Sequence, residues 1–418
     1  MTTLRIEGGR PIAGRVTVGG NKNAALPLIA ACLLTSDRCE LDNLPRIRDV
    51  DVLLRLARQL GVEVAEVDPH RVRLRAQEIT TDEPDRDLVG KLRGSVLLMA
   101  PLLARRRRVV LAPPGGDFPT RRTISTHLLA LEALGARLLE TREGHVLEAP
   151  DGLHGASFYL DEASVTGTET ALLAAASARG ASEIRHAACE PHVVELCTFL
   201  SAMGVGIEGA GTSTLRIEPR ARLRGASHTL WGDYIEAGSW AVVGAIAQGE
   251  LEIVGARRLD LEPVVSVMQR MQVRCDLDDA RLLVHASEPV ALRRITTGLW
   301  PAFPSDLVSL VTVLATQARG RTLIHDWMYE LRLFALEQLS GMNGDLFLCD
   351  SHRIIVTGPR RLRGRALDSK DLRSGMALVA AALAAEGEST VAPLETIERG
   401  YAELVPRLRA LGAQVAVE

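Results

Sequence analysis

Residues 60–62 read Leu60-Gly61-Val62, and variants of this short stretch recur five more times along the 418-residue chain. The middle residues of successive copies are 68 to 74 residues apart. Such regular spacing indicates a sixfold internal repeat of about seventy residues, which decides the fold before any single motif does. The six copies are Leu60-Gly61-Val62, Leu134-Gly135-Ala136, Met203-Gly204-Val205, Met271-Gln272-Val273, Met342-Asn343-Gly344 and Leu411-Gly412-Ala413.

Each copy predicts the end of a helix, because a glycine in this place can adopt the left-handed conformation that caps a helix. Alternating polar and apolar residues then predict a strand, as in residues 71–74 and 214–217. Most repeats also contain an Ala-rich segment, at residues 168–178, 237–247, 307–318 and 376–385. One repeat is therefore expected to run β-α-β-α-β-β, with the Ala-rich helices inside. A solenoid of helical pairs would lack these strands and is disfavoured.

Six such repeats exceed one core, so we expect two domains of three repeats each. The join is predicted near residues 229–232, and the last strand, at residues 414–417, needs a partner. Pairing it with the strands within residues 4–18 places the start of the chain with its second half. The expected domains are residues 21–230, and residues 1–20 together with residues 231–418. Two crossings between lobes predict a hinge and a ligand-binding cleft.

Composition excludes several classes of protein. The chain has 49 basic and 52 acidic residues, and this net charge of −3 argues against a general nucleic-acid binder. We expect a soluble, cytoplasmic protein that does not bind membranes, since no apolar run is long enough to span one. The six cysteines and ten histidines are scattered without metal-ligand spacing, and no phosphate-binding G-x-x-x-x-G-K-[ST] segment occurs. We therefore expect no metal or cofactor, and no obligate protein partner is evident.

A Gly- and Pro-rich segment, residues 113–122, lies between an apolar strand at residues 109–111 and a helix opening near Ile124. It carries Asp117 five residues before Arg122. Glycine and proline in this arrangement predict a mobile loop that combines an acid with an anion-binding guanidinium.

Polar and cationic residues recur at the starts of the Ala-rich helices, where backbone amides already favour anions. Guanidinium groups gathered in this way suit phosphate or carboxylate, so the ligand is predicted to be polyanionic. Arg122, Arg332 and Arg399 lie outside those helices. The residues at the helix starts are Lys22 and Asn23, Arg93, Ser164 to Thr166, Ser305 and Asp306, and Asp371 to Arg373.

The chain resembles the enolpyruvyl transferase family over nearly its whole length, and most closely the branch that acts on a UDP-sugar. The resemblance implies a pair of inside-out α/β barrels that bind phosphoenolpyruvate and a UDP-sugar or related nucleotide. The motifs that carry it are Gly20-Asn21-Lys22-Asn23-Ala24-Ala25-Leu26-Pro27, Pro114-Gly115-Gly116-Asp117, Asp233-Tyr234-Ile235-Glu236-Ala237-Gly238, Pro301-Ala302-Phe303-Pro304-Ser305-Asp306, Asp371-Leu372-Arg373 and Glu398-Arg399-Gly400-Tyr401.

The resemblance also implies roles for individual residues. Asp117 stands where the family usually has a cysteine, and would protonate the methylene carbon of phosphoenolpyruvate. Asp306 would accept the proton of the attacking hydroxyl, and Asn23 would bind the sugar. The phosphate would be held by Lys22, Arg122 and Arg399, and the carboxylate end by Arg332 and Arg373.

The remaining residues implied by the resemblance bind the acceptor. Residues 122–126 would surround the uracil ring, although Ser125 replaces a common aspartate, and Glu162 replaces a lysine that meets the diphosphate. These departures leave two other enzymes open: a transferase that modifies another nucleotide or nucleoside, and a shikimate-phosphate enzyme. A catalytically silent polyanion-binding protein is the third alternative. The acceptor-binding residues are Arg93, Arg122, Thr123, Ile124, Ser125, Thr126, Glu162, Ser164, Val165, Thr166 and Met328.

Overall fold

The structure is a computed structural model that describes residues 2–116, 123–141, 144–330 and 332–418. The chain forms two compact units: unit 1 comprises Met1–Gly19 and Gly232–Glu418, and unit 2 comprises Gly20–Trp231. The two crossing segments are hydrogen bonded to each other on each side of the boundary. Asn21 donates its backbone N–H to the carbonyl of Trp231 (2.8 Å) in unit 2, and Asp233 donates to Gly19 (2.9 Å) in unit 1.

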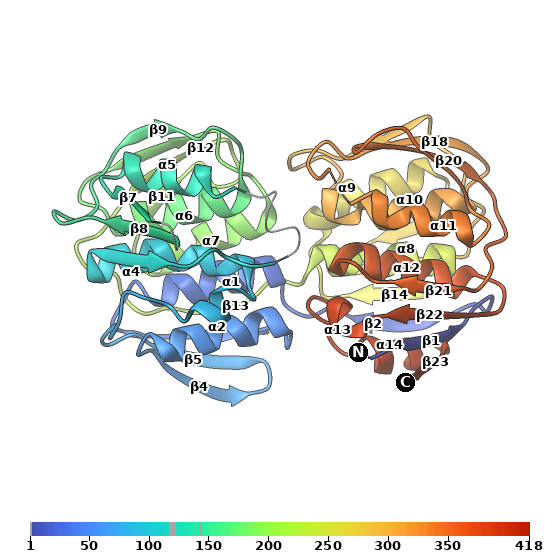
Figure 1. Cartoon of the computed structure of the whole chain (residues 1–418), viewed down its shortest axis with the longest axis horizontal. Helices are drawn as coiled ribbons and strands as arrows, with labels where there is room; N and C mark the ends of the chain where they lie inside the picture. The colour runs from blue at the N-terminus through green and yellow to red at the C-terminus, as the bar shows by residue number, and fades with distance from the viewer. Residues whose placement is uncertain (1, 117–122, 142–143, 331) are drawn as a thin grey trace. The chain divides into compact units, whose positions relative to one another are not determined.

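Unit 2 consists of three consecutive repeats of helices and short strands (Figure 1). In chain order its elements are α1 (Lys22–Cys32), β3 (Arg38–Asp42), α2 (Arg48–Gln59), β4 (Glu63–Asp68), β5 (Arg71–Arg75), α3 (Arg86–Val89), the 3₁₀ helix η1 (Arg93–Leu98), α4 (Met99–Arg106), β6 (Arg108–Leu111), α5 (Ser125–Ala133), β7 (Arg137–Thr141), β8 (Gly144–Glu148), β9 (Ser157–Tyr159), α6 (Val165–Ala175), β10 (Ser182–Arg185), α7 (Pro191–Ala202), β11 (Gly206–Glu208), β12 (Thr214–Glu218) and β13 (Ser227–Thr229).

Unit 1 combines the start of the chain with its second half. Its elements are β1 (Leu4–Glu7), β2 (Gly14–Thr17), α8 (Tyr234–Ile246), β14 (Leu251–Val254), α9 (Arg258–Arg270), β15 (Cys275–Leu277), β16 (Arg281–Val284), β17 (Arg294–Thr296), η3 (Ser305–Leu307), α10 (Val308–Gln317), β18 (Gly320–His325), η4 (Phe334–Glu337), α11 (Gln338–Gly341), β19 (Asp345–Leu348), β20 (Arg353–Gly358), β21 (Ala366–Asp368), α12 (Leu372–Ala384), β22 (Glu388–Ala392), α13 (Leu394–Ile397), α14 (Leu404–Ala410) and β23 (Gln414–Val417).

Each unit has three sheets, one for each repeat. The strand orders are β13-β3-β5-β4, β6-β8-β7 and β11-β12-β10-β9 in unit 2, and β15-β16-β14-β2, β17-β18-β20-β19 and β21-β22-β1-β23 in unit 1. The predicted α/β fold with three repeats per unit is confirmed. The repeat is less uniform than predicted, because among the described residues the β6-β8-β7 sheet has three strands instead of four.

In each unit, one strand beside a boundary of the unit pairs with a strand far away in the sequence. β2 precedes α1 in the chain, yet it pairs in parallel with β14 of unit 1. β13 precedes α8, yet it pairs in parallel with β3 of unit 2. As predicted, the last strand pairs with a strand from the first twenty residues, because β1 lies between β22 and β23.

The six repeated helix ends share one backbone conformation. The middle residue of each copy has a positive φ, between 62° at Gln272 and 107° at Gly204. The residue after it donates its N–H to a carbonyl five positions earlier, as Val62 does to Ala57 (3.0 Å). This is the Schellman pattern, in which two orphan carbonyls of the helix end are satisfied. The caps predicted at the four glycines are confirmed, and Gln272 and Asn343 adopt the same conformation without a glycine.

The Ala-rich helices form the inside of each unit, with sheets toward the periphery (Figure 1). Every residue of α8 is buried, and α6, α10 and α12 are nearly as enclosed. Small residues allow this packing. A Cβ atom on Gly238 would lie 2.6 Å from Cδ1 of Leu307, so no larger residue fits where α8 meets η3.

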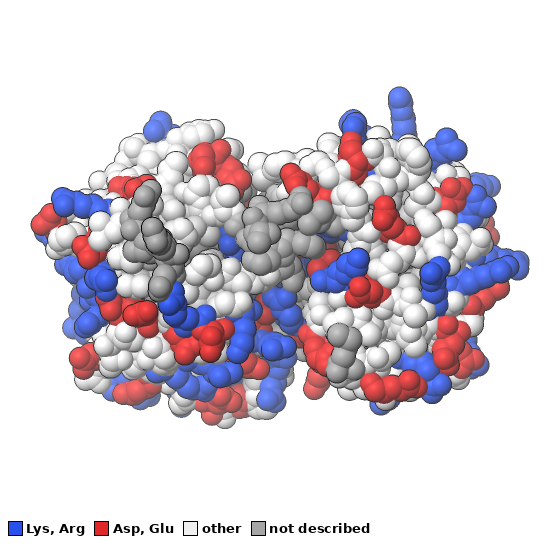
Figure 2. Space-filling view, viewed as in Figure 1, with Lys and Arg blue, Asp and Glu red and all other residues white. Residues whose placement is uncertain are grey.

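The described surface carries mixed charges, and on the face shown in Figure 2 basic and acidic side chains are interspersed. Within the described residues, no helix is both long and apolar enough to cross a membrane. Four arginines, Arg105 to Arg108, follow one another at the end of α4, and the first of them is held by the protein. That side chain donates to the carbonyls of Leu33 (3.2 Å), Ala76 (2.9 Å) and Gln77 (3.1 Å).

Candidate active site

Asp306 is the centre of the polar cluster in unit 1. It lies in η3, which begins the inner helix α10, and its side chain is 26% exposed. Its Oδ2 accepts a hydrogen bond from Arg373 Nη2 (2.9 Å), and its Oδ1 lies 3.2 Å from Arg332 Nη1. Two guanidiniums on one carboxylate favour its charged form, which suits a general base.

Arg373 reaches Asp306 from the first turn of α12. The Asp371 carboxylate caps this helix by accepting from the N–H groups of Arg373 (2.9 Å) and Ser374 (3.1 Å). Behind the guanidinium, Nη1 donates to the Tyr401 hydroxyl (3.2 Å), which lies 2.8 Å from Ser239 Oγ. Because the single Ser239 hydroxyl proton goes to the carbonyl of Ile235 (2.7 Å), Tyr401 donates to Ser239. The phenol thus presents a lone pair to Arg373.

Arg332 is held in a different way. Its Nη1 donates to Ser305 Oγ (3.0 Å), and its guanidinium carbon lies 4.1 Å from the ring centroid of Tyr329. Ser305 directly precedes Asp306, so one short segment supplies both oxygens that meet this guanidinium. The Arg332 side chain is only 10% exposed.

Both guanidiniums remain firmly charged. Burial by itself would lower the pKa of Arg373, but the Asp306 carboxylate and Tyr401 act in the opposite direction, and the pKa is raised above its ordinary value. The same holds for Arg332, where Asp306, Tyr329 and Asp326 outweigh burial and raise the pKa. The cluster therefore offers two fixed positive charges beside one partly exposed carboxylate, an arrangement suited to an anionic ligand.

Arg399 and Met328 are the other two expected residues of unit 1. Arg399 follows α13 and is half-buried, two residues before Tyr401. Met328 is half-buried, and its N–H donates to Asp326 Oδ1 (3.3 Å).

In unit 2, Lys22 is the first residue of α1 and pairs with Asp49 in the first turn of α2. The Nζ–Oδ2 distance is 2.7 Å, and the two side chains are 12% and 6% exposed. Asn21 caps α1 by accepting a hydrogen bond from the N–H of Asn23 (2.8 Å). Asn23 lies in the first turn of α1 and is half-buried. α1 packs against η1.

Arg93 begins η1 and ties it to the segment that leads into α5. Its Nη2 donates to the carbonyl of Thr123 (2.5 Å). Thr123 Oγ1 lies 3.0 Å from Ser125 Oγ, and both residues are exposed, whereas Ile124 is buried. Thr126 Oγ1 donates to Asp161 (2.7 Å) and lies 3.4 Å from Glu162.

The start of α6 joins the same group of residues. Ser164 caps the helix by accepting from the N–H of Gly167 (3.3 Å), and Val165 is half-buried at its first position. Thr166 Oγ1 lies 3.1 Å from Nε2 of the buried His127, whose Nδ1 lies 2.8 Å from Thr170 Oγ1. The structure therefore brings Arg93, Thr123, Ser125, Thr126, Glu162, Ser164 and Thr166 together through neighbouring helix starts.

Asp117 and Arg122 lie outside the described residues. Among the residues that the structure does describe, no group of three or more His, Cys, Asp or Glu side chains could hold a metal ion.

Two buried carboxylates at these sites were not predicted from the sequence. Asp49 pairs with Lys22, and Asp326 accepts from Ser305 and Thr297. Asp326 directly follows the apolar end of β18, and an acid in that position is a usable signal. Asp49 resembles any first-turn helix acid, so no sequence signal separates it from Asp51.

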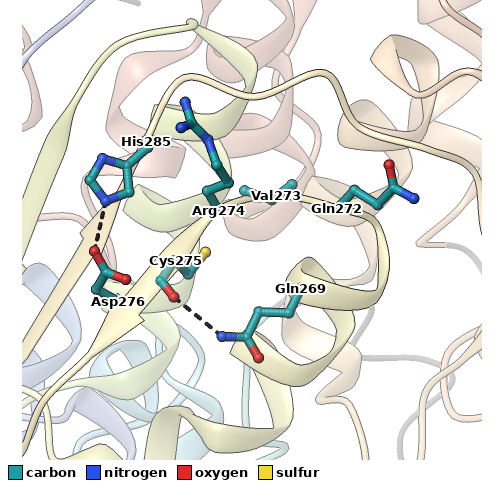
Figure 3. A pocket seen from close by; sticks show the side chains of 7 residues that line it. All are labelled: Gln269, Gln272, Val273, Arg274, Cys275, Asp276 and His285. Carbon is teal, nitrogen blue, oxygen red and sulfur yellow. Dashed lines mark hydrogen bonds and ion pairs between the residues drawn. The ribbon is translucent and has the colours of Figure 1, made fainter.

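A separate groove of about 610 Å³ lies in unit 1 at the end of α9, beside β15 and β16 (Figure 3). His285 Nε2 lies 2.8 Å from Asp276, and Gln269 donates to the carbonyl of Cys275 (3.2 Å). None of the candidate site residues lines this groove.

Comparison with known proteins adds independent information. Residues 6–408 match the family described as EPSP synthase (3-phosphoshikimate 1-carboxyvinyltransferase). The chain is 40% identical to a UDP-N-acetylglucosamine 1-carboxyvinyltransferase of Treponema denticola, over 99% of this chain and 98% of that protein. It is 41% identical to the protein of that name from Bradyrhizobium diazoefficiens, with 98% and 96% covered.

Solved structures show the same architecture. The crystal structure of the enolpyruvyl transferase NikO from Streptomyces tendae matches with a TM-score of 0.89 and 26% identity, over 100% of this chain and 99% of that chain. An EPSP synthase from Acinetobacter baumannii matches over the full length of both chains, with a TM-score of 0.77 and 17% identity. The second likeness concerns the fold alone.

Proposed function

This chain belongs to the EPSP synthase family, and from that membership we propose that it transfers the enolpyruvyl group of phosphoenolpyruvate to the 3-hydroxyl of UDP-N-acetylglucosamine with release of phosphate. The observation that carries the choice of acceptor is the identity of 40–41% over nearly the whole chain to relatives named for this reaction. The Asp306 cluster supports the chemistry, because it combines a base with two anion-binding cations.

The proposed reaction begins with protonation. A carboxylic acid at Asp117 gives its proton to the methylene carbon of phosphoenolpyruvate, and the neighbouring carbon becomes cationic. The sugar hydroxyl attacks that carbon while Asp306 accepts the hydroxyl proton. The Asp117 carboxylate then takes a proton back from the new methyl group as phosphate leaves, which gives the enol ether and restores the acid, and Asp306 passes its proton to the released phosphate. Lys22, Arg122 and Arg399 hold the phosphate, and Arg332 and Arg373 hold the carboxylate.

Acceptor binding is assigned to unit 2. Asn23 binds the sugar, and Arg93 with the amides at the starts of α5 and α6 faces the nucleotide. Thr123 to Thr126 contact the base, Ser164 to Thr166 contact the phosphates, and Met328 of unit 1 adds an apolar contact. A further nucleotide or nucleoside acceptor is the second candidate. It is favoured by the exposed Glu162, since a carboxylate near a diphosphate lowers affinity for that group.

The proposed reaction would place the protein in the cytoplasm at the first committed step of peptidoglycan synthesis, and so in cell-wall formation, cell shape and division. The experiment is a phosphate-release assay with phosphoenolpyruvate and a panel of acceptors. Activity with UDP-N-acetylglucosamine supports the proposal, activity with another acceptor alone supports the second candidate, and no activity with any acceptor refutes both.

The proposed acid has its own test. An epoxide antibiotic that alkylates the cysteine usual at this position should leave the activity unchanged, because a carboxylic acid is a poorer nucleophile than a thiolate. Rapid stoichiometric inactivation would contradict Asp117 as the acid.

A further inference from the structure

Asp326 is a buried carboxylate at the ends of two parallel strands. β17 and β18 pair in parallel up to Thr296 and His325, so the next residues, Thr297 and Asp326, lie side by side. Asp326 is 0% exposed, and Thr297 Oγ1 donates to its Oδ1 (2.8 Å). Its backbone is also fixed, because its N–H donates to the carbonyl of His352 (2.8 Å). This carboxylate is enclosed by the protein.

A chain of hydrogen bonds leads from Asp326 to the cluster around Asp306. Ser305 Oγ lies 2.8 Å and 2.9 Å from the two oxygens of Asp326, and an ionised carboxylate can only accept. The single hydroxyl proton of Ser305 is therefore directed to Asp326. The lone pairs of Ser305 are left for Arg332, whose Nη1 lies 3.0 Å away. Asp326 thus sets the direction of the contact between Ser305 and Arg332.

The two guanidiniums of the cluster consequently differ in what holds them from behind. Arg373 is held by a neutral chain through Tyr401 and Ser239. Arg332 is held by Ser305, which is in turn bound to the Asp326 carboxylate, and the negative charge of Asp326 helps to raise the pKa of Arg332. Loss of Asp326 would release the Ser305 proton to turn elsewhere and would loosen only one of the two guanidiniums.

We propose that Asp326 is a positioning residue for substrate binding, which orients Arg332 through Ser305 so that this guanidinium meets the carboxylate of phosphoenolpyruvate. The proposal rests on the proposed function, in which Arg332 binds that carboxylate. It predicts a larger effect on phosphoenolpyruvate than on the acceptor. Asp326 reaches Arg332 through the Ser305 side chain, whereas it meets the acceptor-binding residue Met328 through a longer contact with the backbone N–H of that residue (3.3 Å).

The test compares four variants with the wild-type protein by steady-state phosphate release. Asp326→Asn keeps the size of the side chain but can donate to Ser305, and Ser305→Ala removes the middle link. Each is expected to raise the KM for phosphoenolpyruvate about tenfold, with the KM for UDP-N-acetylglucosamine changed by less than about twofold. The double variant should resemble the larger single effect, because both substitutions break one chain. Thr297→Val is the matched control. It removes a different hydrogen bond to Asp326, and should leave the KM for phosphoenolpyruvate within about twofold.

Several outcomes would overturn the positioning role. These are an unchanged KM for phosphoenolpyruvate in both single variants, equal rises for both substrates, additive effects in the double variant, or a rise in Thr297→Val as large as in Asp326→Asn. Ser305→Ala keeps the test decisive if Asp326→Asn fails to fold. A wild-type protein that releases no phosphate with any acceptor would refute the proposed function itself. An active wild type whose variants keep the wild-type KM values would refute only the positioning role of Asp326.

Discussion

In the structure, Asp306 contacts the guanidiniums of Arg332 and Arg373, which are both proposed to bind the carboxylate of phosphoenolpyruvate. The ligand must therefore share or displace contacts that the protein makes with itself. Asp306→Asn keeps the size of the side chain and one carbonyl oxygen but removes the negative charge. We expect this variant to bind phosphoenolpyruvate more tightly and to turn it over far more slowly.

The magnitudes follow from the two contacts, at 2.9 Å and 3.2 Å. The amide of Asp306→Asn has one oxygen and can accept from only one of the two guanidiniums. One contact with a charged donor, which contributes about 1.5–3 kcal/mol, is therefore lost. Asp306 is partly exposed, and screening reduces this contribution. A net gain of about 1–2 kcal/mol in ligand binding corresponds to about a five- to thirtyfold lower Kd. Loss of the base should lower kcat by about 10²- to 10⁴-fold.

The binding constant would be measured by calorimetry in the presence of UDP, which lacks the sugar acceptor, and kcat by phosphate release. Glu337→Gln is a suitable control, since it removes an exposed carboxylate from the same unit. Weaker binding of phosphoenolpyruvate in Asp306→Asn, or a kcat within about threefold of the wild type, would refute the reasoning.

Three further predictions concern unit 2. Burial, with the nearby charge of Glu190, raises the pKa of Glu169 well above 4.5, so the native state keeps a proton that the unfolded state loses. Stability should then fall by up to about 1.4 kcal/mol per pH unit from about pH 4.5 up to the folded-state pKa. Glu169→Gln should remove this slope in denaturant unfolding from pH 5 to 8. Asp49→Asn takes the carboxylate from a largely buried ion pair, and should lower the free energy of unfolding by about 1–3 kcal/mol in the same assay; no change would contradict a structural role for the pair. Gly115→Ala would place a Cβ 1.9 Å from the carbonyl oxygen of Gly90, so the segment before Asp117 must shift. We expect kcat to fall at least about tenfold in phosphate release, and unchanged kcat would show that the position of this segment is unimportant.

Much of the fold was predictable because each repeat ends in the same local structure. A left-handed cap depends on a few neighbouring residues, so it can be read from Leu60-Gly61-Val62 or from its later copies. The individual pairing partners of β2 and β13 were not predicted. Strands of three or four residues carry little information about their partners, and parallel pairing joins segments far apart in the chain.

The residues of the candidate site were likewise predictable only in part. Asp306 and Arg373 were singled out as charged residues at helix starts, and Arg332 as a cation outside those helices. The structure joins the three in one cluster. The position of Asp326 after a strand marks it as a candidate, but its role could not be predicted, since that role depends on burial and on the direction of one hydroxyl proton. The roles of Asp117 and Arg122 stay predictions, and these two residues lie outside the described part of the chain.

The long-range pairing of β1 and β2 also sets an order of events for a nascent chain on the ribosome. Unit 2 is one continuous segment, so all its strands have left the ribosome before most of unit 1 is made. β2 precedes that whole segment but finds its partner β14 only after it. β1 waits longer still, because it lies between β22 and β23, which are both made after β14. Unit 2 can therefore fold during translation, whereas the sheet around β1 can form only after β22 and β23 have been made.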